Sequence, residues 1–191
     1  MRFSETPLSG AYLIEPEPLG DDRGFFARMW CRQEFVEHGL DATLAQCNLS
    51  FNERAGTLRG MHFQHQPHPE VKLVRCTQGA VWDAIVDLRP DSPTYCRWHA
   101  EVLTDQNRAM LYVPAGFAHG YLTLTDSAEV FYQVTEYYYQ NLEGGVRWDD
   151  PTFGIEWPEN GPFILSPKDR AWPDYQPAGR SEPTRKLNDH S

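Results

Sequence analysis

Short apolar runs recur along most of the chain, and glycine, proline, aspartate or asparagine separates each run from the next. These separating residues favour turns, and runs this short suit strands better than packed helices. Successive runs begin roughly 8–12 residues apart, a spacing typical of β-sandwiches and β-barrels. The pattern therefore predicts an all-β fold. The expected strands cover residues 10–14, 25–30, 43–50, 57–64, 72–77, 80–88, 97–103, 110–113, 120–124 and 129–138.

Little helix is expected. Residues 32–38 predict one helix that ends at Gly39, because glycine readily adopts the left-handed conformation that follows a last helical turn. A second short helical region is expected after Pro167. We interpret residues 1–176 as a single domain. Residues 177–191 are rich in proline, glycine and charge and lack an apolar period, so they predict a disordered tail.

Composition and charge exclude several classes of protein. The chain has 191 residues, 40% of them hydrophobic and 13% aromatic, which is enough for one domain with a substantial core. Its formal charge of -10 argues against non-specific nucleic-acid binding, which needs a basic face. An anionic small substrate stays compatible, because a local cluster of arginines overrides the global sign.

Nothing in the sequence predicts a membrane or secreted protein. No apolar run approaches the roughly 20 residues that span a bilayer, and the N-terminus lacks the apolar segment of a secretory signal. The four cysteines form no C-x-x-C pair; they are Cys31, Cys47, Cys76 and Cys96. We expect reduced thiols in a cytoplasmic protein with no membrane partner.

Alternation along the expected strands assigns residues to faces. Gln46, Asn48 and Ser50 share one face of residues 43–50, and Tyr132 and Tyr138 share one face of residues 129–138. In residues 80–88 one face is wholly apolar and the other carries two aspartates between apolar residues. Such a sheet fits a barrel whose lumen holds a ligand, and it fits a sandwich with one wet face equally well.

Three cationic or titratable residues lie inside apolar, strand-like sequence: Arg59, His62 and Lys72. Such groups are seldom buried without a partner, so the three together indicate a pocket that holds an anion and moves a proton. In an ideal strand Arg59 and His62 would point to opposite faces. A β-bulge at Gly60 could turn one of the two side chains to the other face, and without it the two residues do not serve one pocket.

His62 is the leading candidate for a general base, because an unperturbed histidine has a pKa of about 6.5. Taken alone, it reads more readily as a core or half-exposed histidine with a satisfied hydrogen bond. His65, His68 and His119 raise the alternative of a metal site. The spacing of His62 and His65 is not the H-x-H pair of metal-binding cupins, and histidines three apart on a strand face opposite ways. We therefore predict no metal.

Each remaining candidate has a plain structural reading beside its chemical one. Lys72 at a strand start is usually solvated, but in a lumen it can stabilise an oxyanion. His119 could line a pocket or cap a turn. Tyr138 could simply pack, although a phenol is also a competent acid. Asp169 and Arg23 read by default as a loop aspartate and a hairpin-turn arginine.

Taken in order, the motifs resemble the dTDP-4-dehydrorhamnose 3,5-epimerases, which are cupin-class epimerases of sugar nucleotides. The resemblance extends over almost the whole chain up to about Asp169, and the ordered set of motifs is far more specific than any single one. The matching segments are residues 22–26 (DRGFF), 46–50 (QCNLS), 56–64 (GTLRGMHFQ), 72–75 (KLVR), 86–89 (VDLR), 92–94 (SPT), 114–120 (PAGFAHG), 147–151 (RWDDP) and 155–158 (IEWP).

The resemblance implies a role for each matched residue. It makes His62 the catalytic base and Asp169 the aspartate that pairs with it, and it places Lys72 beside the sugar keto oxygen. It makes Tyr138 the acid across the sugar ring and Tyr132 a second active-site tyrosine. The positions that it implies for the sugar-nucleotide site are Arg23, Phe26, Gln46, Asn48, Arg59 and His119, with Arg23 and Arg59 as the expected phosphate contacts.

The resemblance also implies a jelly-roll barrel that uses no metal or coenzyme and forms a homodimer. Independently, a strand at residues 10–14 would need a sheet to pair with, and exchange between protomers is one way to supply it. Removing a proton next to a ketone needs a base, a group that holds the enolate oxygen and an acid on the opposite face. His62, Lys72 and Tyr138 have those chemistries.

Two residues depart from the family pattern. Arg28 stands where the thymidine-linked enzymes usually have glutamate, and Glu70 stands where glutamine is common. Arg28 is expected near the nucleotide base, so the nucleotide, the 4-keto sugar and the choice of C3, C5 or both stay open. Two alternatives to an epimerase are a metal-dependent cupin, such as a dioxygenase or isomerase, and a non-catalytic barrel that binds sugar nucleotides.

Overall fold

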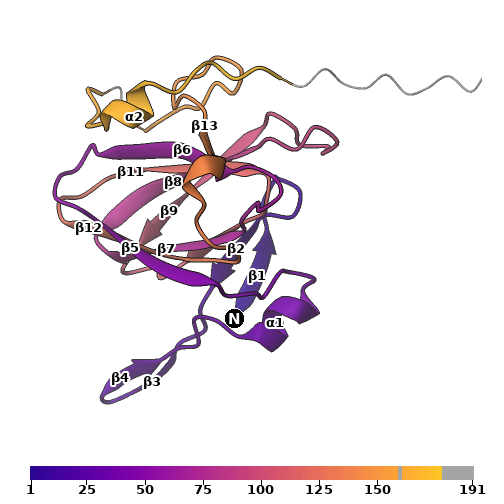
Figure 1. Ribbon diagram of the computed structural model, residues 1–191. Coiled ribbons are helices and arrows are strands. Elements are labelled where there is room, and N and C mark those ends of the chain that lie inside the picture. The colour runs from indigo at the N-terminus through magenta and orange to yellow at the C-terminus, as the bar shows by residue number, and fades with distance from the viewer. Residues whose placement is uncertain (159–160, 178–191) are drawn as a thin grey trace, which may run out of the picture.

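Two antiparallel sheets face each other in the computed structural model, which describes residues 1–158 and 161–177 (Figure 1). The larger sheet runs in the order β1 (Arg2–Glu5), β2 (Tyr12–Glu15), β10 (Met110–Val113), β7 (Lys72–Gln78), β12 (Ala128–Val134) and β5 (Gln46–Asn52). The smaller sheet runs in the order β13 (Glu143–Gly145), β6 (Leu58–Gln64), β11 (Phe117–Thr123), β8 (Ala80–Asp87) and β9 (Trp98–Thr104).

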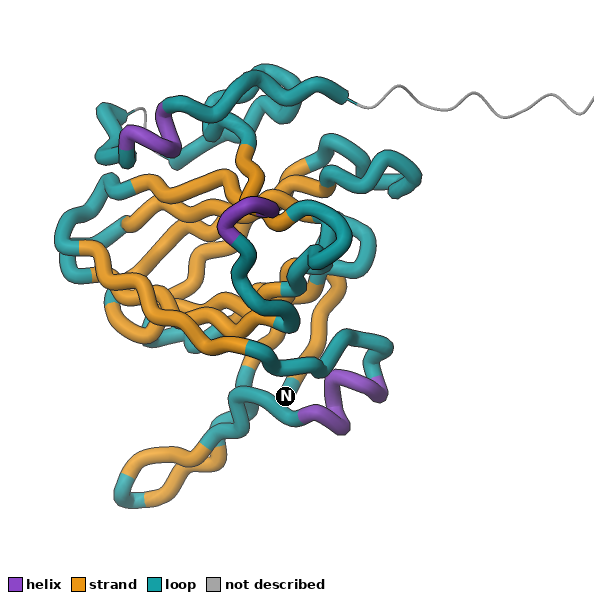
Figure 2. The backbone as a smooth tube through the Cα atoms, viewed as in Figure 1, coloured by secondary structure: helices purple, strands orange, loops and turns teal. Residues whose placement is uncertain are grey.

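Helices in the described residues are short: α1 (Arg32–Glu37), the 3₁₀ turn η1 (Gln140–Leu142) and α2 (Pro167–Arg170). The predicted all-β, cupin-like jelly-roll barrel with a few short helices is confirmed. Figure 2 shows how strands form the barrel wall while loops and helices lie around its ends. Most of the predicted tail, residues 178–191, lies outside the described residues.

The hydrophobic core lies between the two sheets, where alternate residues of facing strands meet. Val81 and Ile85 of β8 pack there with Val74 of β7, Leu111 of β10 and Val130 of β12, and all five are fully buried. The face of β8 that carries the two aspartates is therefore the inner face, as a ligand-holding lumen requires.

The wholly apolar face of β8 points outward and is covered by the C-terminal segment. Ala84 and Val86 pack against Phe153, with Trp82 and Trp157 at the edge of the same cluster. In Figure 1 this segment crosses the outer side of the smaller sheet and carries α2 with it. The covering layer explains how β8 is buried on both faces.

β6 contains a bulge at Gly60. His62 pairs with His119 and Arg59 pairs with Tyr121, so β6 uses one residue more than β11 between the two pairs. Gly60 has a φ of 123°, and a Cβ atom there would lie 2.6 Å from the Cα of Gly120. Only glycine fits such an approach, and the bulge turns Arg59 and His62 toward one cavity.

Two expected strands are shorter than predicted. The strand expected over residues 129–138 ends at Val134, so the parity argument that put Tyr132 and Tyr138 on one strand face was wrong. Beyond Thr135, which still bonds to Val71, the backbone leaves the sheet. The strand expected over residues 25–30 stops at Phe26.

Three short strands were missed, two of them for a compositional reason. β1 is largely polar, and β13 contains two glycines, which strands disfavour. β1 and β10 both pair with β2 within the same chain, so the strand expected at residues 10–14 needs no partner protomer to cover it. That reason for expecting strand exchange was therefore wrong.

The third missed strand belongs to a hairpin that leaves the barrel. β3 (Leu19–Asp21) pairs with β4 (Gly24–Phe26), and Figure 1 shows this hairpin reaching away from both sheets. Leu19 is 72% exposed and Phe26 is 66% exposed, although Arg108 lies over the ring of Phe25 at 4.6 Å, so the hairpin has only partial cover from its own chain. We call residues 19–28 the arm.

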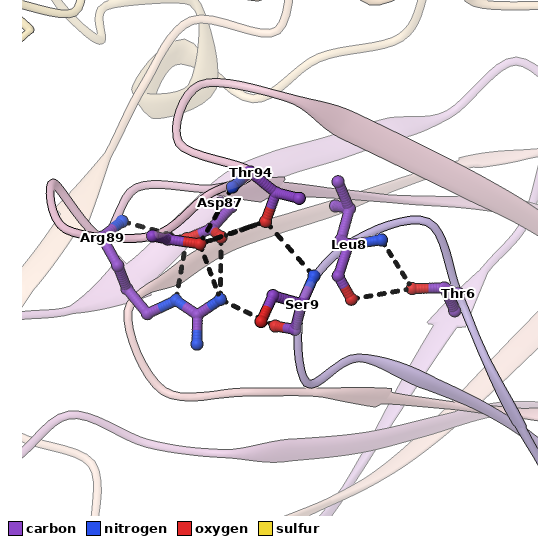
Figure 3. Close-up of polar contacts among 7 residues, drawn as sticks. Thr6, Leu8, Ser9, Asp87, Arg89 and Thr94 are labelled. Atoms are coloured by element: carbon purple, nitrogen blue, oxygen red, sulfur yellow. Dashed lines mark hydrogen bonds and ion pairs between the residues drawn. The ribbon is translucent and has the colours of Figure 1, made fainter.

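Asp87, fully buried at the end of β8, ties the following loop to the N-terminal segment (Figure 3). Its carboxylate accepts hydrogen bonds from Arg89 Nε at 2.8 Å and Thr94 Oγ1 at 2.6 Å. Arg89 also donates to the Ser9 carbonyl, and the Ser9 amide donates to Thr94 Oγ1. The motifs around residues 86–94 therefore stabilise one end of the barrel.

Membrane-spanning helices and disulfides are both absent from the described residues. No helix within the described residues is long and apolar enough to cross a membrane. All four cysteines are unpaired, as expected for reduced thiols.

Candidate active site

Two adjoining cavities occupy the lumen of the barrel, with volumes of about 330 Å³ and about 240 Å³. They share three lining side chains, His62, Lys72 and Tyr132. We call them the tyrosine cavity, which Tyr138 also lines, and the arginine cavity, which Arg59 also lines. Their combined size is in the range of small-molecule sites in proteins.

His62 and Asp169 form a close pair at the wall of both cavities. The Nε2 atom of His62 lies 2.5 Å from Oδ1 of Asp169, and Ser166 Oγ donates to the other carboxylate oxygen at 2.9 Å. Burial by itself would raise the pKa of Asp169, but the hydrogen bonds from His62 and Ser166 outweigh it and the pKa is lowered. An ionised Asp169 accepts the proton of Nε2, which leaves Nδ1 of a neutral imidazole as the basic atom.

α2 explains why Asp169 can serve a residue on β6. Ser166 caps this helix by accepting the Asp169 amide at 3.0 Å, and Pro167 occupies its first turn. The cap holds the main chain of Asp169 while its carboxylate stays only 4% exposed. The short helical region expected after Pro167 is therefore present and positions a member of the pair.

Lys72 begins β7 and is largely buried in the lumen rather than solvated. Its ammonium lies 3.1 Å from Oε1 of Glu70, and the side chains of Lys72 and Glu70 are 11% and 16% exposed. An ammonium at this place can donate to an oxygen that gains negative charge. The sequence analysis noted that Glu70 stands where the family usually has glutamine, but it did not assign Glu70 to the site.

Two tyrosines complete the tyrosine cavity. Tyr132 is half-buried on β12, and burial raises the pKa of its phenol. Tyr138 is 57% exposed, and its hydroxyl donates to Glu143 Oε2 at 2.9 Å, a bond that raises its pKa. Glu143 also pairs with Lys168. Both phenols therefore keep their protons at neutral pH, as a proton donor must.

The arginine cavity has the groups of an anion site. Arg59 is held by a bond from its Nε to Asn52 Oδ1 at 2.7 Å. His119 is 8% exposed, and its Nε2 lies 3.0 and 2.9 Å from the two oxygens of the fully buried Asp83. Sequence reasoning noticed the two aspartates of residues 80–88 but did not connect Asp83 with His119, because the pattern within one strand does not show that β8 and β11 are neighbours in a sheet.

Further lining residues come from β5 and from its surroundings. Gln46 and Asn48 line the tyrosine cavity and Ser50 lines the arginine cavity, in agreement with their shared parity. Lining residues that sequence reasoning did not assign are Ser50, Phe63, Gln64, Glu70, Tyr121, Val134 and Glu143.

Three expected site residues lie elsewhere in the single chain. Arg23, Phe26 and Arg28 are all on the arm, away from the lumen (Figure 1). Arg23 is paired with Asp21, and Arg28 lies 3.4 Å from Glu34. The structure therefore brings nine of the twelve predicted residues to the lumen or its wall; these are Gln46, Asn48, Arg59, His62, Lys72, His119, Tyr132, Tyr138 and Asp169.

The described residues contain no group of three or more His, Cys, Asp or Glu side chains placed to share a metal ion. His62 and His119, the histidines of the lumen, are each paired with an aspartate. A base, a fixed ammonium and protonated phenols around one cavity can remove a proton next to a carbonyl and return it. In class, the fold and site are those of a proton-transfer enzyme built on a jelly-roll barrel.

Comparison with known proteins identifies the family. A family model described as dTDP-4-dehydrorhamnose 3,5-epimerase matches residues 5–176, and the chain belongs to this family. A relative with that name from Sinorhizobium fredii is 42% identical over 173 residues, which cover 91% of this chain and 89% of the relative. The predicted class, an epimerase of nucleotide-linked 4-keto-6-deoxy sugars, is confirmed, and the metal-dependent and non-catalytic alternatives are not favoured.

Solved structures of similar proteins have the same fold as this chain. A Bacillus anthracis dTDP-4-dehydrorhamnose 3,5-epimerase, solved with TDP and PPi bound, superposes with a TM-score of 0.87 at 42% identity over 91% of this chain and 99% of its own. A 3'-monoepimerase from Streptomyces bikiniensis, solved with dTDP-quinovose, superposes with a TM-score of 0.82 at 32% identity over 88% of this chain and 85% of its own. The family fold therefore accompanies inversion at one centre or at two.

Proposed function

We propose that this protein inverts C3 and C5 of a dTDP-linked 4-keto-6-deoxyhexose by proton transfer alone. The observation that carries the proposal is the His62–Asp169 pair, which shares one cavity with Lys72 and Tyr138. Both C3 and C5 are next to the C4 ketone. One ammonium that holds the C4 oxygen therefore serves both carbons, and one cavity accommodates both inversions.

Each step has a residue of suitable chemistry. His62 Nδ1 removes the proton, while Asp169 keeps Nε2 protonated and stabilises the imidazolium that forms. Lys72 donates to the enolate oxygen, and Tyr138 gives a proton to the opposite face of the carbon. A well-placed proton-transfer group contributes roughly 10²–10⁴-fold to a rate. No metal or coenzyme takes part in these steps, and we propose that none is needed.

The arginine cavity is proposed to hold the diphosphate. Arg59 is a fixed guanidinium, and Asp83 holds the ring of His119 beside it. A local guanidinium explains how a chain with a formal charge of -10 attracts a diphosphate. Asn48, on the same inner face of β5 as Ser50, is placed to bond the hydroxyls of the sugar.

A homodimer would complete the site. The arm exposes Arg23 and Phe26 and reaches away from its own barrel, so we propose that it contacts the site of a second copy. Phe26 would cover the nucleotide base and Arg23 would meet phosphate, while Arg28 would read the base edge. Exchange of an exposed element between identical chains is a common route to a dimer. The unpaired thiols support a cytoplasmic location.

The test is incubation with dTDP-, CDP-, GDP- and UDP-linked 4-keto-6-deoxyglucose in D₂O, followed by NMR of the sugar H3 and H5 signals. With the dTDP substrate we expect loss of both signals and the H1, H2 and methyl chemical shifts of the inverted sugar, with or without EDTA. A folded protein that exchanges neither proton in any of the four sugars would refute the proposal.

A further inference from the structure

The segment that carries Tyr138 lies outside both sheets. β12 ends at Val134, and the backbone of residues 137–139 has no ladder of its own before η1 begins at Gln140. The side chain of Tyr138 is 57% exposed, so packing does little to hold its ring. Apart from the hydrogen bond of its hydroxyl to Glu143, the phenol therefore depends for its position on whatever holds this piece of main chain.

Gln64, at the end of β6, bonds to the residues on both sides of Tyr138. Its Nε2 donates to the Tyr137 carbonyl at 3.0 Å, and its Oε1 accepts the Tyr139 amide at 2.8 Å. The same Nε2 donates to the His68 carbonyl at 2.6 Å. Gln64 is only 5% exposed, so the three bonds are shielded from water.

Gln46, on β5, holds Tyr138 itself. Its Oε1 accepts the backbone amide of Tyr138 at 2.8 Å. Two carbonyls meet the nitrogen of the Gln64 amide and an N–H meets its oxygen, so the partners determine which way that amide points. Together the two glutamines replace the sheet ladder that β12 no longer supplies.

The glutamines also connect the acid to the base. Gln64 lies two residues after His62 on β6, and both side chains line the tyrosine cavity. His62, the base, is therefore a residue of β6, and Tyr138, the acid, is held to β6 by hydrogen bonds from the Gln64 side chain to its two neighbours. A change in that amide would move Tyr138 relative to the sugar while leaving His62, Asp169 and Lys72 in place.

We propose that Gln64 and Gln46 are positioning residues that set how often a proton returns from Tyr138 rather than from His62. Return from His62 restores the starting configuration, and return from Tyr138 inverts it. The glutamines thereby set the ratio of inversion to exchange. This inference rests on the proposed function, in which Tyr138 is the acid.

The experiment compares the wild-type protein with Gln64→Met. This change keeps the length of the side chain but removes all three hydrogen bonds that the Gln64 amide makes. In D₂O, NMR gives two rates for each centre: deuterium uptake with retained configuration and formation of the inverted sugar. We expect inversion to fall roughly 10- to 100-fold, because small misplacements of a reacting group have effects of that size, while total uptake stays within about 3-fold. Tyr138→Phe in the same assay provides the limiting value of the ratio.

Gln78, at the end of β7 opposite Lys72, provides a control. Gln78 Nε2 donates to the Ser127 carbonyl at 2.8 Å, far along the strand from Lys72, so Gln78→Met removes an exposed glutamine-to-carbonyl hydrogen bond without touching the site. It should keep the wild-type ratio. If Gln64→Met does not fold, Gln46→Met, which removes one bond to the Tyr138 amide, should lower the ratio in the same direction.

The two proposals fail separately. A wild-type protein that inverts no sugar overturns the proposed function. A wild-type protein that inverts, combined with folded glutamine variants that keep the wild-type ratio, overturns the positioning role alone. Equal loss of uptake and inversion in Gln64→Met also overturns it, because a general structural defect slows both.

Discussion

Nε2 of His62 lies 2.5 Å from Oδ1 of Asp169, although the two residues are 107 positions apart. One comes from the bulged strand β6 and the other from the first turn of α2, a helix outside both sheets. The pair therefore exists only when the C-terminal segment is packed on the barrel. Its chemistry can be tested through the tautomer that Asp169 imposes.

Asp169→Asn should lower deuterium uptake at C3 and C5 roughly 10²–10⁴-fold. An asparagine amide can donate to Nε2, which moves the imidazole proton to Nδ1 and removes the base. The measurement is the rate of H3 and H5 loss in D₂O. Asp149→Asn, which changes an aspartate paired with Arg147, should retain the wild-type rate. An unchanged rate in folded Asp169→Asn would contradict the assigned tautomer.

Tyr138→Phe should separate the two halves of the reaction. His62 can still remove a proton and return it to the same face, so uptake continues with retained configuration while inversion falls. Tyr132 lines the same cavity and could act as a substitute acid, so Tyr132→Phe/Tyr138→Phe is the sharper variant. Product configuration is read from the chemical shifts of the sugar H1, H2 and methyl signals, which deuteration leaves in place. Inversion by the double variant at the wild-type rate would exclude both tyrosines as the acid.

Arm exchange predicts complementation between inactive variants. Coexpressed His62→Ala and Arg23→Ala chains should regain activity, because a mixed dimer joins an intact barrel with an intact arm. Random pairing leaves about a quarter of the sites complete. Coexpressed His62→Ala and Asp169→Asn should regain none, since both residues belong to one barrel. Equal behaviour of the two mixtures, or a monomeric mass in light scattering, would rule out a shared site.

Arg28→Glu should change the preference among nucleotides. A guanidinium offers only donors and a carboxylate only acceptors, so the two recognise different base edges. Calorimetric titration of dTDP, CDP, GDP and UDP should show a changed order of affinity, with dTDP gaining relative to the others. Arg54→Glu, a charge change on an exposed loop residue, is the control. The same four affinities before and after the Arg28 change would refute a role in base selection.

Asp87→Asn should destabilise the protein at neutral pH by about 2–3 kcal/mol, because charge-assisted bonds to Arg89 and Thr94 are lost (Figure 3). This corresponds to a fall in Tm of about 5–10 °C. Asp91→Asn, an exposed residue of the same loop, should have little effect.

The Asp87 effect should also depend on pH. Burial alone would raise the pKa of Asp87, but bonds from Arg89, Ser92 and Thr94 outweigh it and the folded-state pKa is lowered. The carboxylate therefore stabilises the fold fully above the unfolded-state pKa of about 3.9, and this contribution is lost as pH falls through the lower folded value. The Tm difference from wild type should narrow in acid. A difference that stays constant down to pH 2 would contradict this sign.

The bulge at Gly60 is a case where local sequence was sufficient. In an ideal strand Arg59 and His62 would point to opposite faces, which conflicts with a shared pocket. A β-bulge at the glycine between them was one way to resolve this conflict. The structure adds the reason that the glycine is required, because Gly120 of the neighbouring strand lies where a Cβ would be. A parity conflict is visible in one strand, but the backbone that forbids a side chain belongs to another.

The segment around Tyr138 shows the opposite case. Its three consecutive tyrosines read as a continuation of β12, since aromatic residues favour strands. The strand nevertheless ends at Val134, because the glutamines of β5 and β6 offer the backbone other partners. Propensity describes a residue and its neighbours in sequence, and it carries no information about side chains that arrive from distant strands.

By itself, the sequence determined the all-β class, the positions of most strands and the identity of the basic and acidic groups, because turn residues and alternation are local properties. Only the tertiary structure decided which of these groups meet: Asp169 with His62, Asp83 with His119, and Glu70 with Lys72. It also decided that the arm carries Arg23 and Phe26 away from their own barrel. These contacts depend on which strands become neighbours, on how the chain enters β7 and on how the C-terminal segment packs on the barrel. Each of these arrangements is a property of the whole chain.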